Sequence, residues 1–543
     1  MRALVPLPVL LPLFAVGVKF LLGPRRMRAQ TLISLTVLLA DTVISSVLLV
    51  AADRHGPIVV QVGSFAAPLG ISLVVDRFSG LMLAISSSVT LCVLIYSQSQ
   101  RTADENEDEA GAPLSVFYPT YLVLAAGIAD SFLAGDLFNL YVGFEVMLTA
   151  SYVLMTIGGT DARIRHGAVY IMVGAASSLL FVAAVAVAYA ACGTVNLADL
   201  AVQLGRVAPA ARLAVQVLLI TVFAVKAAIF PLSAWLPDSY PTAPAPVTAV
   251  FAGLLTKVGI YSLIRTQTLL FPQDRQTALL YTVAAFSMII GILGAVAQAD
   301  LKRLLSFTLV SHVGFLVLGL AIGSVRALSG ALFYAITHIT VQTSLFLVTG
   351  LIERREGTAD FGRLAGLARL APVLGLLFFI PAMNLAGIPP LSGFIAKLAL
   401  LQAAAADGGV GAYVLLGAML TTSLLTLYAM TKVWARAFWR APGEGLGKEA
   451  ERQIVMPGST GVAVIRSTVG DARGIGGRRI STSESYPAGM LGATIALILL
   501  SLAYTVWAGP IAEYTQRAAI ELLHPNAYIT AVQAVRHVQG GAH

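Results

Sequence analysis

The chain has 543 residues, of which 57% are hydrophobic and only 11% charged. Soluble domains carry about 25% charged residues, and so few could not cover the surface of a soluble fold with polar groups. The net charge of +8 comes mainly from short loops between apolar runs, where basic residues orient membrane helices. These features exclude an ordinary soluble protein and argue against a nucleic-acid partner.

A bilayer core requires about 20 apolar residues per helix, and the sequence contains about fourteen such runs. They lie near residues 3–22, 30–51, 76–97, 114–134, 137–157, 167–191, 210–230, 243–268, 277–298, 303–323, 327–352, 372–403, 411–438 and 488–509. Strands of a membrane barrel alternate over about 10 residues, whereas these runs are continuously apolar. The sequence therefore predicts an all-α polytopic protein of the cell membrane with about 14 transmembrane helices.

The basic residues predict how the helices are oriented. The first apolar run precedes its basic cluster, the reverse of a cleavable signal peptide, so we expect it to be a membrane helix. Four loops on one side are rich in Lys and Arg: those with Arg25, Arg26 and Arg28, with Arg163 and Arg165, with Lys302 and Arg303, and with Arg354, Arg355, Arg363 and Arg369. We expect that side to face the cytoplasm and both termini to face outward.

Three segments interrupt the apolar runs. Residues 55–75 alternate loosely and contain Gly and Pro, which predicts a short hairpin on the outer surface. The acidic residues at 104–109 are expected in a solvated loop, and 441–487 in a flexible cytoplasmic loop. Cys92 and Cys192 form no metal-ligand spacing, and nothing in the sequence argues for a disulfide between them.

Six titratable side chains lie inside the apolar runs. They are Glu145, Lys226, Lys257, His312, His338 and Lys397. A charge at the bilayer centre costs at least about 2.5–3.5 kcal/mol, so each is expected to have a function or a partner. One or two could be structural ion pairs, but six groups in six helices favour a transport path over that alternative.

Proton transfer is the chemistry that this set suits. Burial favours the uncharged form of a group and a nearby opposite charge favours the charged form. A lysine whose carboxylate partner engages or releases it can therefore exchange a proton near neutral pH. We expect Glu145 and Lys226 to be the switchable pair, Lys257 and His338 the relay, and Lys397 the far terminal donor or acceptor.

Three assignments stay open from the residues alone. Lys397 could instead extend its amine to the membrane surface if its helix breaks at the nearby prolines. His312 is placed near the start of its helix, where it could be a polar packing residue. Asp136 begins a helix and could be its N-terminal cap or a cation entrance, and we favour the cap.

Prolines cluster beside two of the lysines. Pro231, Pro237, Pro241, Pro244 and Pro246 follow Lys226, and Pro389 and Pro390 precede Lys397. Proline breaks helices, and the freed carbonyls must face protein or water at membrane depth. We therefore expect helices 7 and 12 to be broken and a hydrated pocket beside Lys226. Broken helices an odd number of helices apart are typical of inverted repeats in transporters.

Four longer motifs resemble one family. They are GDLFNLYVGFEVMLTASYVL, FPLSAWLPDSYPTAPAPVTAVFAGLLTKVGIY, DLKRLLSFTLVSHVGF and NLAGIPPLSGFIAKLALL. They are similar to the antiporter-like subunits, found in Mrp-type multisubunit cation/proton antiporters and as proton-pumping subunits of respiratory complex I. The form DLFNLYVGFE is most similar to the D subunits of Mrp antiporters. The resemblance covers roughly residues 70–435.

The resemblance carries expectations about fold and site. It implies two inverted five-helix repeats, helices 4–8 and 9–13, around a hydrophilic axis. Glu145, Lys226, Lys257 and Lys397 match the acid and lysine positions of the family, and His338 matches its histidine. The family commonly has a lysine four residues after that histidine, whereas this sequence has Gln342. The link between the half-channels would then depend on His338 and water.

The resemblance also implies the organisation and the partners. The expected regions are 1–110 with helices 1–3 and the hairpin, 111–270 and 271–440 as the two repeats, 441–487 as the polar loop, and 488–543 as the last helix and tail. We expect a proton-conducting subunit of a Na⁺/H⁺ antiporter, working with other membrane subunits on protons and Na⁺ or another monovalent cation, without a cofactor or metal centre. The alternatives are a pump subunit of complex I or a membrane hydrogenase, and a non-transporting scaffold subunit, which Gln342 would favour.

Overall fold

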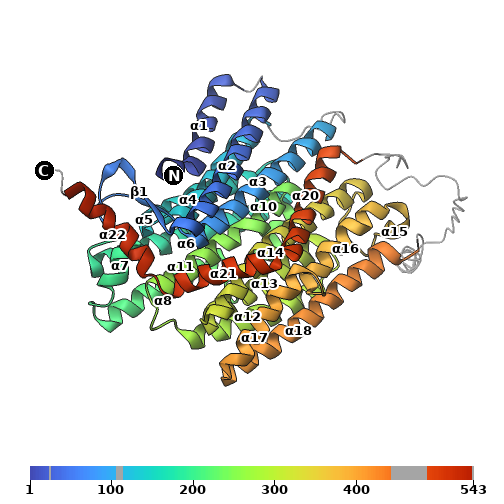
Figure 1. The fold of residues 1–543 in the computed structure, drawn as a ribbon. Helices are drawn as coiled ribbons and strands as arrows, with labels where there is room; N and C mark the ends of the chain where they lie inside the picture. The colour runs from blue at the N-terminus through green and yellow to red at the C-terminus, as the bar shows by residue number, and fades with distance from the viewer. Residues whose placement is uncertain (24–25, 105–113, 442–485, 541–543) are drawn as a thin grey trace, which may run out of the picture.

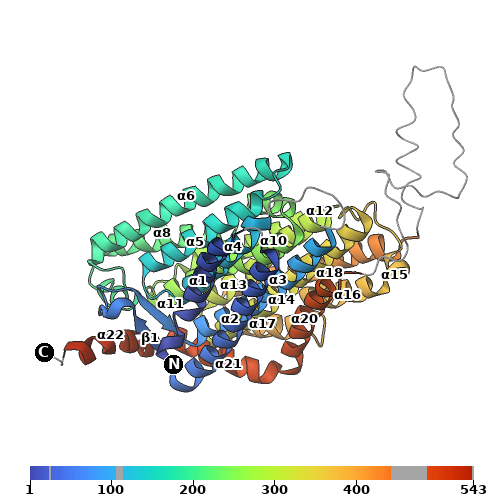
Figure 2. The ribbon, with the colours of Figure 1, turned by 90° about the horizontal axis from the view of Figure 1, so that it is seen from above.

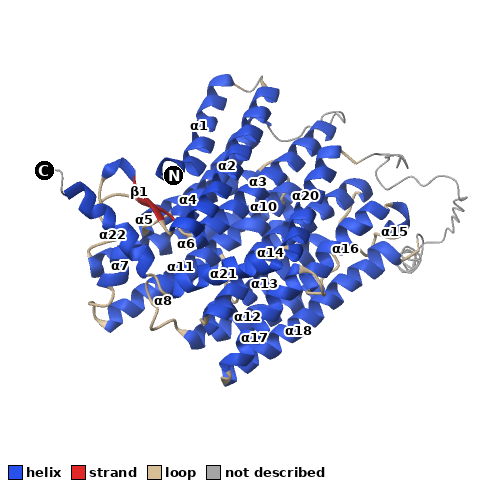
Figure 3. Cartoon of the chain, in the orientation of Figure 1, coloured by secondary structure: helices blue, strands red, loops and turns tan. Residues whose placement is uncertain are grey.

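The computed structural model describes residues 1–23, 26–104, 114–441 and 486–540. Figures 1 and 3 show long, roughly antiparallel helices with one small hairpin. Within these ranges, 12 helices are long and apolar enough to cross a membrane, and two shorter apolar helices, Leu7–Leu22 and Pro372–Ala386, lie among them. The chain is a multi-pass all-helical membrane protein, as predicted. Of the acidic loop expected at 104–109, Asp104 is the last residue of a helix, whereas 105–109 and most of the loop at 441–487 lie outside the described residues.

The N-terminal region contains three long helices and the hairpin. Its elements are η1 (Arg2–Leu4), α1 (Leu7–Leu22), α2 (Met27–His55), β1 (Ile58–Gln61), η2 (Val62–Ser64), β2 (Ser72–Val75) and α3 (Arg77–Asp104). The strands pair antiparallel, with Ile58 opposite Val75 and Gln61 opposite Ser72. The hairpin predicted over 55–75 is thus confirmed.

The middle of the chain forms two further groups of helices. The first consists of α4 (Leu114–Leu133), α5 (Leu137–Thr156), α6 (Asp161–Cys192), α7 (Leu197–Gln203), α8 (Pro209–Lys226), α9 (Leu236–Ser239), η3 (Tyr240–Thr242), α10 (Ala245–Val250), the π-helical turn η4 (Phe251–Leu255) and α11 (Thr256–Leu269). The second consists of α12 (Thr277–Ala297), α13 (Leu301–Ile322), α14 (Val325–Glu356), α15 (Leu367–Leu370), α16 (Pro372–Ala386), α17 (Ser392–Asp407), α18 (Val410–Val433) and the π-helical turn η5 (Trp434–Trp439).

Two of the apolar runs form interrupted helices, as the prolines predicted. The run 210–230 ends its helix at Lys226, before Pro231, because proline offers no backbone donor to continue the ladder. The run 372–403 becomes α16 and α17, since Gly387 adopts a φ of 86° and two prolines follow. Both interruptions lie beside the lysines at which the prolines predicted them.

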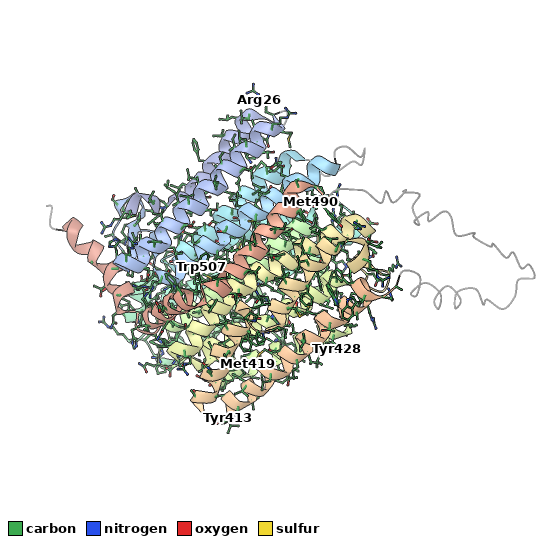
Figure 4. All side chains as sticks on the ribbon, turned by 45° about the vertical axis from the view of Figure 1, so that its right-hand side comes forward. Arg26, Tyr413, Met419, Tyr428, Met490 and Trp507 are labelled. Carbon is green, nitrogen blue, oxygen red and sulfur yellow. The ribbon has the colours of Figure 1, made fainter. Side chains whose placement is uncertain are left out.

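The central helices are α10, α11, α13 and α14. The span Ala245–Leu269 is completely buried, as are the middle of Val325–Glu356 and nearly all of α13, whereas most residues of α2, α6 and α18 are at least partly exposed. Figure 2 shows α6 along one edge and the C-terminal helices along the opposite edge. On α18, the exposed side chains of Tyr413 and Tyr428 point away from the bundle (Figure 4). The outer helices therefore offer apolar surface to lipid or to neighbouring subunits.

The same backbone junction occurs twice. On the side of the hairpin, called here the hairpin side, the α4–α5 connection pairs with the α6–α7 connection. On the opposite side, called the basic side because Lys302 and Arg303 lie there, the α12–α13 connection pairs with the segment after α14. The hydrogen bonds are Leu137 N to Val195 O and Leu197 N to Gly135 O, and Leu301 N to Ala359 O and Phe361 N to Ala299 O, all 2.9–3.1 Å.

The C-terminal segment, expected as a last helix and a tail, is helical along nearly all of its described length. It forms α20 (Ala488–Val506), α21 (Ala508–Leu523) and α22 (Asn526–Gly540). The chain turns at Trp507 (Figure 4), and α21 then crosses the bundle over α14, α11 and α3 (Figure 1). Arg77 at the start of α3 pairs with Glu521 of α21 at 3.0 Å, which ties the crossing helix to the hairpin side.

A buried ion pair joins the hairpin to the core. Arg265 of α11 pairs with Asp76, which follows β2, at 2.6 Å, and both side chains are almost completely buried. Burial alone would raise the pKa of Asp76, but the charge of Arg265 and hydrogen bonds from Arg265 and Ser79 outweigh it and lower that pKa. The pair therefore stabilises the fold at neutral pH, and the contribution is lost only as the pH falls through the lowered pKa.

Replacing Asp76 with Ala is expected to destabilise the protein strongly. Removing one partner of a buried pair leaves an uncompensated charge and costs about 3–5 kcal/mol. Thermal unfolding in detergent would measure the loss. Asp53→Ala is the matched control, since its pairs with Arg77 and Arg517 are partly exposed and should contribute about 1 kcal/mol or less. Equal losses from the two variants would contradict this account.

Candidate functional site

Lys226 lies at the broken end of α8, against a small cavity. Its Nζ donates to Ser178 Oγ at 3.1 Å and lies 5.5 Å from the centre of the Phe144 ring. The cavity of about 20 Å³ lies where the prolines predicted a pocket, between α5, α6, α8 and the segment after the break. That volume holds about one water.

The cavity has unused hydrogen-bonding groups. Ser177 Oγ, Trp235 Nε1 and the Tyr240 hydroxyl are buried without a partner among the described residues, and all three residues line the cavity with Lys226. Buried polar groups are normally satisfied by protein or water. The arrangement is therefore suited to an ordered water that contacts Lys226.

Glu145, the expected switchable partner of Lys226, forms no ion pair with it within 4.0 Å in this structure. It lies midway along α5, one residue from Phe144, whose ring packs beside Lys226. Its Oε1 is buried without a hydrogen-bond partner, and no described basic side chain lies within 4.0 Å of its carboxylate. The sequence places both groups in one region, but their separation depends on how α5 and α8 pack.

Lys257 occupies the centre of the bundle. It is fully buried in α11, and its Nζ donates to the carbonyl of Ala252 in the π-helical turn at 2.7 Å. Such turns shift the backbone ladder and occur often at functional sites. A Cβ on Gly253 in this turn would collide with Oγ1 of Thr343, so glycine is what lets α14 pack directly against the segment before Lys257.

His338 and His312 form a second buried group between α13 and α14. Their ring centroids lie 5.3 Å apart. The Tyr334 hydroxyl lies 2.7 Å from Nδ1 of His312, whose Nε2 lies 3.1 Å from Oγ1 of Thr426. Neither ring nitrogen of His338 has a partner among the described residues. His338 is therefore the histidine with free capacity to exchange a proton with water.

The expectation that His312 lies near the start of its helix is wrong. α13 begins at Leu301, so His312 lies in its middle and is fully buried. Asp300 caps this helix by accepting from the backbone N–H of Arg303. The helix therefore begins before residue 303, where the apolar run in the sequence begins. The imidazole lies beside the predicted path rather than near a helix end.

Lys397 is buried at the break between α16 and α17. Its Nζ donates to the carbonyls of Leu385 and Ala386 at 2.8 and 3.2 Å. These carbonyls end α16 and have no helical partner, and the negative end of the helix dipole favours a cation there. Its Nζ also lies 5.8 Å from the centre of the Tyr334 ring. The amine thus points into the protein, and the alternative in which it reaches the membrane surface is wrong.

Gln342 occupies the position at which the family commonly has a lysine. Its Nε2 donates to the carbonyl of Leu305 at 2.7 Å, while its Oε1 is buried without a partner in the described part of the chain. Thr256, Thr337 and Thr422 also have buried hydroxyls without partners among the described residues. These groups lie on α11, α14 and α18.

A larger polar cavity opens on the basic side. Its volume is about 480 Å³, and its lining combines residues of both halves of the chain. Lys302 pairs with Glu353 at 2.5 Å, and Arg303 pairs with Asp238 at 2.7 Å. Charged groups in an open cavity of this size remain hydrated, which gives water access to the junction of the two halves.

Asp136 is the N-terminal cap predicted from the sequence. Its carboxylate accepts from the backbone N–H of Asn139 at 2.6 Å, and its second oxygen has no partner among the described residues. Burial raises the pKa of Asp136 to about 6, although hydrogen bonds from the backbone N–H groups of Asn139, Ser72 and Phe138 lower it. Asn139 also donates to Asp130 Oδ1 at 3.1 Å.

Two buried charged residues in the first helices were missed by the sequence reasoning. Lys19 lies in α1 and is 1% exposed, and Asp41 lies in α2 and is 4% exposed. The rule that singled out Glu145, a charge inside an apolar run, would have found both. Cys92 and Cys192 are free thiols. The described residues contain no group of three or more His, Cys, Asp or Glu side chains placed to hold a metal ion.

Comparison with known proteins relates this geometry to a family. The family described as NADH:quinone oxidoreductase/Mrp antiporter, transmembrane, matches residues 134–426. The D subunit of the Na⁺/H⁺ antiporter of Alkalihalophilus pseudofirmus is 38% identical over 98% of this chain and 99% of that relative. The corresponding D subunit of Bacillus subtilis is 34% identical over 98% and 99%.

A solved structure shows the same fold. A chain in the structure of the Mrp complex from Dietzia sp. DQ12-45-1b superimposes with a TM-score of 0.83 and 31% identity, covering 98% of this chain and 99% of that chain. The segment that the family model matches, residues 134–426, contains all five residues of the predicted proton path. The chain belongs to the family of membrane subunits that NADH:quinone oxidoreductases and Mrp antiporters share.

Proposed function

We propose that this chain is the proton-conducting subunit of a multisubunit Na⁺/H⁺ antiporter. The names of its relatives support that assignment over a respiratory pump. It is then a secondary transporter subunit rather than an enzyme, and it assembles with other membrane subunits in the cell membrane. The observation that carries the proton-conducting role is the series of titratable side chains inside the bundle from α5 to α17, four of them buried, together with buried polar groups that lack partners among the described residues.

The proposed path has five titratable groups: Glu145, Lys226, Lys257, His338 and Lys397. Each amine or imidazole accepts a proton from one neighbouring water and returns it to the next, so that no charge remains on the path after a full transfer. The unpartnered hydroxyls and Gln342 Oε1 support water between the titratable groups, because buried polar atoms without protein partners are normally hydrated. His312 and Tyr334 pack beside His338 and Lys397 and fix the positions of these two side chains.

The repeated junction supports the proposed inverted repeats. Asp136 and Asp300 cap α5 and α13, and each cap adjoins one of the two paired connections on opposite sides of the bundle. An inverted repeat places equivalent elements at opposite membrane faces. Counting membrane spans in chain order, which differs from the α labels, we therefore assign spans 4–8 and 9–13 to the two repeats. This gives fourteen spans in all, with breaks beside Lys226 and Lys397.

The test uses everted vesicles from an antiporter-deficient strain that carries the whole operon. A pH-sensitive dye would follow the proton gradient after sodium is added, for wild type and Glu145→Ala. We expect sodium to dissipate the gradient with wild type and not with the variant. If sodium has no effect while NADH-driven proton uptake depends on Lys226, the chain is a respiratory pump subunit instead.

A further inference from the structure

A second buried polar site lies among the N-terminal helices, outside the matched family segment. A cavity of about 10 Å³ is enclosed by α1, α2, α3 and α4. Its polar lining consists of Asp41 and Ser45 from α2 and Ser86, Ser87 and Thr90 from α3. All five residues are at least nine-tenths buried. The volume is at the lower limit for one water-sized species.

Two groups in this cavity lack partners. Asp41 Oδ1 and Ser45 Oγ are buried without a hydrogen bond to any described residue. No described basic side chain forms an ion pair with Asp41. Lys19 bonds instead to Ser34, which lies about 10 Å from Asp41 along α2 at 1.5 Å per residue. A carboxylate at this depth must be neutralised by something other than a neighbouring side chain.

The remaining hydroxyls present acceptors to the cavity. Ser86 donates to the carbonyl of Leu83, Ser87 to that of Ala84, and Thr90 to that of Ser87, each at 3.0 Å. A hydroxyl that has donated its hydrogen keeps only lone pairs for another partner. Every polar side chain of the lining therefore offers oxygen lone pairs, and only Ser45 still has a hydroxyl hydrogen that is not donated to a described residue.

We propose that this cavity binds one dehydrated monovalent cation of about the size of Na⁺, with Asp41 as its charged ligand and hydroxyl oxygens completing the shell. Hard cations prefer oxygen ligands, and a lining of acceptors around an unpaired carboxylate selects a cation over an anion or a neutral donor–acceptor molecule. The small volume favours Na⁺ over larger ions. The site is separate from the proton path, so it stands or falls independently of the proposed function.

Sodium binding to the purified whole complex tests this site directly. Equilibrium binding of radiolabelled sodium would be measured for wild type, Asp41→Asn and Ser46→Ala. Ser46 is the adjacent residue on the exposed face of α2 and donates to Thr42, so its removal controls for changes to the helix. We expect Asp41→Asn to lose one bound sodium ion per complex and Ser46→Ala to lose none. Unchanged stoichiometry in Asp41→Asn would overturn the proposal.

A second measurement separates a cation from a proton. If Asp41 carries a proton instead, infrared spectroscopy will show a protonated-carboxyl band that Asp41→Asn removes and that sodium does not change, and this would also overturn the proposal. Should Asp41→Asn fail to assemble, Ser45→Ala and Ser86→Ala replace it. Loss of one oxygen ligand to a charged group should weaken sodium binding about tenfold, whereas unchanged affinity in both would refute the site.

Discussion

Sodium-driven proton release is expected to fall at least about 100-fold when Lys226 is replaced by alanine, the size typical of losing a positioned proton-transfer group. Lys226 is the only titratable side chain lining the described cavity at the α8 break other than two tyrosines. Its amine contacts Ser178, and the groups around it that lack partners among the described residues are suited to hold a water beside it. Alanine leaves that water without a group that can hold the proton between steps.

The measurement is the dye assay in everted vesicles, with the amount of assembled complex determined in the same membranes. Lys432→Ala is the matched control. Lys432 lies on α18 and donates to the carbonyls of Val296 and Gln298, away from the proposed path, so its loss should leave antiport near the wild-type rate. Assembled Lys226→Ala complex with wild-type activity would remove this lysine from the path.

A loss of similar size, about 100-fold, is expected for His338→Ala. His338 lies between Lys257 and Lys397 in the proposed order, and the lysine that would normally follow it is replaced by Gln342, which cannot carry a proton. Both of its ring nitrogens lack protein partners among the described residues, so the imidazole is free to accept a proton from water on one side and release it on the other. The buried stretch of α14 contains no other histidine, lysine or carboxylate to replace it.

Replacing His312 with alanine distinguishes a role in proton transfer from a role in helix packing. His312 is hydrogen-bonded to Tyr334 and faces Thr426, so its removal should lower thermal stability while it reduces antiport less than His338→Ala does. Initial rates over a range of pH, together with unfolding temperatures in detergent, would distinguish the two. If His312→Ala abolishes antiport in a stable complex while His338→Ala is active, the roles of the two histidines are reversed.

The comparison of sequence with structure is clearest at the three lysines. The sequence predicted that Lys226, Lys257 and Lys397 lie inside membrane helices, and that prolines break the helices beside the first and last. It did not predict that Lys257 binds a carbonyl of a π-helical turn or that Lys397 caps the end of α16. Those contacts depend on the angle at which each broken helix continues, which local sequence leaves open.

The amino-acid pattern was enough to predict the membrane location, the helical class, the hairpin, the Asp136 cap and the titratable residues that lie at membrane depth. These features are local, because a membrane helix satisfies its own backbone and its span follows from a continuous apolar run. Only the packed bundle reveals that Glu145 forms no ion pair with Lys226, that His312 faces His338, and that Asp41 and the α3 hydroxyls share one cavity. Each of these depends on packing between helices whose side chains meet only after the bundle has assembled, and hydrophobic patterning does not specify the rotation and depth of one buried helix against another.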